Sequence, residues 1–104
     1  MDEAELGKRL FGAAERAAKQ RGVRFGQGAD GDIRFIADQA AREIAQLPAP
    51  EQKDKAAQAE HALERLVDAM VEATDEIPGY QKGIIGEKTL ERAKIKLCPL
   101  WPIC

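Results

Sequence analysis

Few residues in this 104-residue chain belong to the types that build reactive or metal-binding sites. It contains two cysteines, one histidine, one tryptophan, one tyrosine and three phenylalanines. Two cysteines are too few for a disulfide-rich framework, and a tetrahedral metal site needs four protein ligands, or three with a water. No nucleophile motif or orienting group surrounds the histidine, His61. The sequence therefore predicts no catalytic residue, no cofactor and no metal site within one chain.

An excess of positive charge and a long apolar run are also missing. Sixteen basic and eighteen acidic residues give a formal net charge of −2, which provides no overall positive field to hold nucleic acid. No stretch approaches the roughly 18 apolar residues of a membrane span. The beginning, MDEAELGKRL, lacks the basic and apolar segments of a signal peptide. These absences favour a cytoplasmic protein that does not associate with membranes.

What the sequence does have is alanine-rich helical periodicity. Apolar residues recur at intervals of three and four over residues 3–21, 32–47, 51–76 and 86–97, which predicts a helix in each range. Glycines follow the first range, and prolines end the second and third. We expect an all-α antiparallel bundle of about four helices over residues 1–97, without strands. Residues 98–104 would form an extended proline-containing tail.

The helix predicted over residues 51–76 has the most regular stripe. Its apolar positions alternate intervals of four and three, as in a coiled-coil seam: Ala59, Leu63, Leu66, Met70, Ala73 and Ile77. This spacing predicts the central helix of the bundle. We also expect Leu63, Leu66 and Met70 to contribute to a contact with a partner or a second copy of the chain.

Charge is unevenly distributed along the chain. Residues 1–48 carry eight acids and eight bases, residues 49–81 carry eight acids and three bases, and residues 82–104 carry two acids and five bases. The last two ranges therefore have net charges of −5 and +3. Because opposite charges bias how surfaces meet, the basic fourth helix should lie beside the acidic third.

The last eight residues, LCPLWPIC, hold both cysteines, the tryptophan and two of the five prolines. Leu100, Trp101 and Ile103 form an apolar cluster that is unfavourable in water, so it should pack either on the bundle or on a partner. A short loop could bring Cys98 and Cys104 within disulfide distance. A thiol redox site, or a metal site shared between two chains, is an alternative use of the same cysteines.

The segment GIIGEKTLERAKIKL carries a second pattern, formed by Gly83, Ile84, Thr89, Leu90, Arg92, Ala93 and Lys94. Over these 15 residues it resembles the recognition-helix end of some helix-turn-helix proteins. The resemblance implies that Lys88, Arg92 and Lys94 would contact phosphates or base edges of DNA. The neighbouring acids Glu87 and Glu91 would repel a phosphate backbone.

These observations favour a small non-catalytic interaction or adaptor protein, expected to be a homodimer, that acts through the third helix and the tail. A DNA-binding regulator using residues 83–97 is one alternative. A thiol redox or metal-binding protein using Cys98 and Cys104 is the other.

Overall fold

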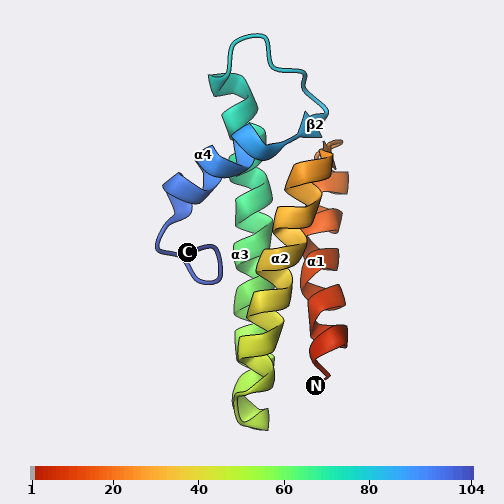
Figure 1. The fold of residues 1–104 in the computed structure, drawn as a ribbon, viewed down its shortest axis with the longest axis vertical. Coiled ribbons are helices and arrows are strands. Elements are labelled where there is room, and N and C mark those ends of the chain that lie inside the picture. The colour runs from red at the N-terminus through yellow and green to blue at the C-terminus, as the bar shows by residue number, and fades with distance from the viewer. Residues whose placement is uncertain (1) are drawn as a thin grey trace.

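Four helices and two short strands make up the fold in the computed structural model, which describes residues 2–104. In chain order they are α1 (Glu3–Gln20), β1 (Arg24–Phe25), α2 (Gln27–Ala45), α3 (Ala49–Glu76), β2 (Ile84–Ile85) and α4 (Glu87–Leu97). Figure 1 shows α1, α2 and α3 side by side along the long axis, with α2 running opposite to the other two. The shorter α4 crosses α3 obliquely (Figure 1). The prediction of an all-α fold with four helices is confirmed.

Alanine sets how closely the three long helices approach. The buried face of α1 carries Ala13, Ala14 and Ala17, and that of α3 carries Ala56 and Ala59. These small side chains let the helices pack closely, and larger residues fill the space between them. The largest fully buried side chains include Leu6, Leu10, Ile33, Ile44, Leu63, Leu66 and Met70. Burying each of these contributes roughly 1.5–3 kcal/mol, so the long helices supply most of the hydrophobic core.

A glycine turn ends α1 and directs the chain into β1. Gly22 has a φ of +69°, a left-handed conformation that favours glycine. Its N–H donates to the carbonyl of Lys19 at 3.1 Å, and the N–H of Val23 donates to the carbonyl of Ala18 at 3.0 Å. These two bonds satisfy carbonyls that the helix end would leave free. The turn therefore fixes the direction in which β1 leaves the bundle.

The helix predicted over residues 32–47 begins earlier than expected. It starts at Gln27, so Gly28 and Gly31 lie inside α2. The prediction was wrong here because glycine usually interrupts a helix, whereas tertiary contacts override that preference at Gly28. A Cβ atom on Gly28 would clash with the carboxylate of Glu87. The missing side chain is what allows Glu87, in the first turn of α4, to cover the start of α2.

The expectation of no strands was also wrong. β1 and β2 pair in parallel, with Arg24 opposite Ile84 and Phe25 opposite Ile85. Two residues per strand are too short to produce the alternating pattern that predicts a strand from sequence. The pairing brings the loop after α1 beside the loop after α3. It therefore joins the start of α2 to the start of α4.

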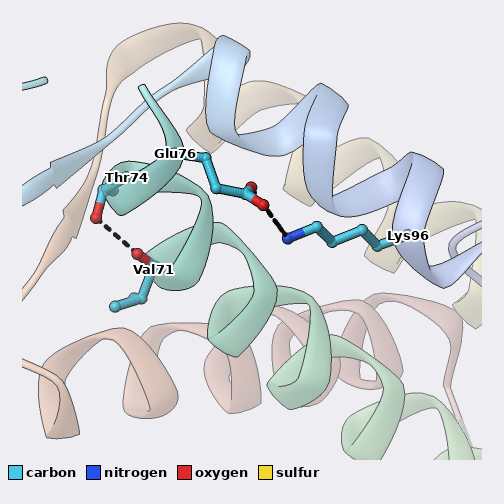
Figure 2. A network of polar contacts seen from close by, with 4 residues as sticks. All are labelled: Val71, Thr74, Glu76 and Lys96. Carbon is cyan, nitrogen blue, oxygen red and sulfur yellow. Dashed lines mark hydrogen bonds and ion pairs between the residues drawn. The ribbon is translucent and has the colours of Figure 1, made fainter. Parts of the chain in front are cut away.

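The basic α4 lies against the end of the acidic α3, as the charge distribution predicts. Figure 2 shows the Lys96 ammonium pointing at the Glu76 carboxylate, and the distances to the two carboxylate oxygens are 2.8 and 3.0 Å. In the same helix end, the Thr74 hydroxyl donates to the carbonyl of Val71 at 2.6 Å (Figure 2). Beyond the helix end, Lys82 pairs with Asp75 at 2.9 Å. Of these pairs, Lys96 and Glu76 join α4 to α3, whereas the other two lie within α3 or join it to the loop that follows.

None of the helices in the described part of the chain combines the length and apolar character needed to cross a membrane.

Candidate functional site

The C-terminal tail folds back onto its own chain. Ile103 is 4% exposed and belongs to the hydrophobic core, and Leu100 and Trp101 are half-buried against that core. The indole N–H of Trp101 donates to a carboxylate oxygen of Glu43 on α2 at 2.9 Å. The Lys55 ammonium on α3 lies 4.5 Å from the centroid of the indole ring. Of the two fates expected for the tail, the structure has it packed on the bundle.

A disulfide joins Cys98 to Cys104 and closes the tail into a ring. The two Cα atoms are 5.3 Å apart, and both cysteines are exposed. Residues 98–99 and 101–103 lie in turns, so the ring is turned and not extended as expected. No group of three or more His, Cys, Asp or Glu side chains in residues 2–104 is placed to hold a metal ion.

The seam of α3 is used within the chain. Leu63, Leu66 and Met70 are fully buried against the other helices. Within a single chain they are therefore not available as the contact surface that we expected for them. The seam describes the central helix correctly from Ala59 to Ala73, where every seam side chain is buried, whereas Ile77 is half-buried and follows the end of α3.

The predicted nucleic-acid contacts on α4 are only partly presented to solvent. Lys88 and Arg92 are exposed, whereas Lys94 is half-buried. Glu87 and Glu91 are also exposed on this helix. His61 is exposed on α3, beside Glu64, Arg65 and Asp68 in a small hollow between α1 and α3. In that hollow the Arg21 guanidinium forms an ion pair with the Asp68 carboxylate.

A hollow with a volume of about 570 Å³ lies where α1 ends and α2 begins. We call it the basic cleft. Its lining residues are Gly12, Glu15, Arg16, Ala18, Lys19, Val23, Arg24, Phe25 and Asp30. The half-buried Val23 and Phe25 supply apolar surface. Arg16, Lys19 and Arg24 are exposed and supply the positive charge.

Two lining residues of the basic cleft, Phe25 and Asp30, form contacts with side chains outside it. The rings of Phe25 and Phe11 have centroids 6.1 Å apart. The Arg34 guanidinium covers the Phe11 ring at 4.0 Å from its centroid, and its Nε lies 3.0 Å from the Asp30 carboxylate. Asp30 therefore has its charge matched by Arg34 from its own helix, and not by a cation of the cleft.

Two cations of the cleft lack a partner. In the described residues, the side chains of Lys19 and Arg24 form no hydrogen bond or ion pair. Arg16 lies 3.6 Å from Glu60, but Arg9 binds that carboxylate more closely, at 2.7 Å. Glu15 is an exposed acid on the cleft wall. The unmatched charge of the cleft is therefore mainly positive.

Sequence reasoning missed this cleft because it summed charge over residues 1–48, where acids and bases cancel. A narrower range contains the signal: residues 16–29 include Arg16, Lys19, Arg21 and Arg24 but no acid. The Gly22 turn then wraps this basic run around the end of α1. Without the turn and the β1–β2 pairing, the run alone would not indicate a cleft.

Comparison of the chain with protein-family models, with curated proteins and with solved structures finds no match.

Proposed function

We infer that this protein is a non-catalytic binding protein, and that its basic cleft binds an acidic segment of a partner protein. The observation that carries the proposal is the pair of unmatched cations, Lys19 and Arg24, beside the apolar surface of Val23 and Phe25. Unpaired cations beside a half-buried aromatic ring suit a peptide with carboxylates and apolar side chains. Such charge complementarity gives specificity and a faster association rate.

A protein partner suits the cleft better than nucleic acid does. The whole chain has a net charge of −2, which gives no overall positive field to hold a continuous phosphate backbone. On α4, the exposed Lys88 and Arg92 alternate with exposed Glu87 and Glu91. Because nucleic-acid binding depends mainly on neutralising phosphates, this mixed surface favours the protein partner. The alternative, DNA binding through α4, is tested in the same experiment as the protein partner.

Self-association is one form that the partner could take. Residues 49–81 have a net charge of −5, so the acidic surface of a second copy would complement the basic cleft. The homodimer expected from the sequence would then use the cleft in place of the buried α3 seam. We propose the cytoplasm as the compartment in which this binding takes place.

The test compares two charge-reversed variants with the same net charge. Lys19→Glu/Arg24→Glu reverses the cleft, and Lys8→Glu/Lys53→Glu reverses two exposed lysines outside it. The probe is a fluorescein-labelled peptide of Glu and Phe, and its control has Lys in place of Glu. Each exposed pair contributes up to about 1 kcal/mol, so reversing both sites should weaken binding about tenfold or more.

The proposal expects the acidic peptide to bind the wild type and the Lys8/Lys53 variant equally. It is contradicted if the two double variants bind the acidic peptide alike, or if the basic peptide binds as well. The same titration with mixed duplex DNA addresses the alternative. Salt-sensitive DNA binding that disappears in Lys88→Ala/Arg92→Ala/Lys94→Ala would assign the function to α4 instead. Sedimentation of both double variants shows whether a second copy is the partner.

A further inference from the structure

The disulfide ring at residues 98–104 joins two surface residues and is anchored at its apolar side chains. Cys98 and Cys104 are both exposed, so the disulfide lies at the surface of the molecule. Between them, Ile103 is 4% exposed and is part of the core. The ring therefore combines a disulfide at the surface with the buried side chain of Ile103, one residue before Cys104.

Non-covalent contacts hold both ends of the ring. The N–H of Cys98 donates to the carbonyl of Lys94 at 2.9 Å, which continues the hydrogen bonding of α4. At the other end, the N–H of Cys104 donates to the carbonyl of Leu100 at 3.1 Å. The burial of Ile103 and the 2.9 Å bond from Trp101 to Glu43 fix the ring against the bundle. These contacts favour the closed ring in addition to the covalent bond.

We propose that Cys98 and Cys104 form a reversible dithiol–disulfide exchange site, and that its oxidation is coupled to the docking of Trp101 and Ile103 on the bundle. The coupling follows from linkage: contacts that favour the closed ring also favour the disulfide, and the disulfide favours those contacts equally. Reduction would therefore loosen the docked tail. This inference does not depend on the basic cleft.

The reaction partner is a dithiol reductant, the class of molecule that keeps cytoplasmic thiols reduced. Its thiolate attacks one ring sulfur, the Cys98–Cys104 bond breaks, and the departing thiolate takes up a proton. The second thiol of the reductant then attacks the mixed disulfide and releases the other cysteine. The chain gains two electrons and two protons, and the reductant becomes a disulfide.

The test equilibrates the full chain with mixtures of reduced and oxidised dithiothreitol. Alkylation of free thiols followed by mass spectrometry gives the fraction of reduced protein. The two isoleucines near this end of the chain provide a matched pair, since Ile103 is 4% exposed and Ile95 is 77% exposed. We expect Ile103→Ala to shift the equilibrium toward the dithiol about tenfold or more. Ile95→Ala should stay within about twofold of the wild type.

Trp101 provides a second readout because it is the only tryptophan. Its fluorescence should shift on reduction and return on reoxidation. If Ile103→Ala does not fold, as judged by circular dichroism, the smaller change Ile103→Val should give a shift in the same direction. Equal equilibria for the Ile103 and Ile95 variants would overturn the coupling. A disulfide that dithiothreitol cannot reduce in the folded chain would overturn the exchange site.

Discussion

Replacing Gly31 with alanine tests whether α2 begins at Gln27 or only after the glycines. Gly31 is the fifth residue of α2, it is exposed, and no heavy atom lies within 4 Å of where a Cβ would be placed. Its φ is outside the left-handed region. Alanine is better than glycine inside a helix by about 0.5–1 kcal/mol. Gly31→Ala should therefore stabilise the protein by that amount, which corresponds to a rise of about 2–8 °C in melting temperature.

Gly79 is the matched control for this substitution. A Cβ at Gly79 would also meet nothing within 4 Å, but its φ is +71°. Because a side chain is strained in that conformation, Gly79→Ala should destabilise the protein by about 1–2 kcal/mol. Both free energies of unfolding can be measured by urea titration with circular dichroism. A neutral or destabilising Gly31→Ala would refute the assignment of Gly31 to the interior of α2. It would indicate that Gly31 precedes the helix, where alanine is less favourable than glycine.

Two further predictions concern the α3–α4 corner. The Tyr80 hydroxyl accepts a hydrogen bond from the N–H of Gly86 at 2.8 Å. Because Tyr80→Phe removes this bond, it should lower the free energy of unfolding by about 0.5–1.5 kcal/mol. An unchanged urea midpoint would argue against this bond. The hydrogen bond and charge of Asp75 raise the pKa of Lys82 above its usual 10.5. Since the folded pKa is the higher one, this pair stabilises the protein below about pH 10.5 and loses that effect as the pH rises further. The wild type and Lys82→Gln should therefore differ slightly in stability at pH 8 and converge once the pH exceeds the raised pKa of Lys82. A difference that grows with pH would contradict the assignment.

The helical core was predictable because its signal is local and periodic. Leu63, Leu66 and Met70 repeat at the helical interval, and each is fully buried in the structure. The start of α2 was not predictable, because the missing side chain at Gly28 makes room for a carboxylate 59 positions further along the chain, on Glu87. Single-residue preferences contain no information about such a neighbour.

The sites depend on contacts between residues that are distant in sequence. The tail was recognised as an apolar anchor around Trp101, but its partners Glu43 and Lys55 lie on two other helices. No sequence interval links them to the tail. The basic cleft likewise needs the Gly22 turn and the pairing of β1 with β2. The sequence therefore identified the residues of the tail, but it did not indicate the surface they cover or the cleft.

Site-specific photocrosslinking tests the central claim, that the basic cleft binds an acidic segment of a partner. A benzoylphenylalanine would replace the exposed Glu15 on the cleft wall, and in a separate protein the exposed Ala57 on α3. We expect the benzoylphenylalanine at position 15 to crosslink the partner, and the one at position 57 not to. The partner peptides captured in this way should contain an excess of Asp and Glu. These crosslinks should disappear when Lys19→Glu/Arg24→Glu is added. Equal capture at both positions, or captured peptides that are mainly basic, would contradict the claim.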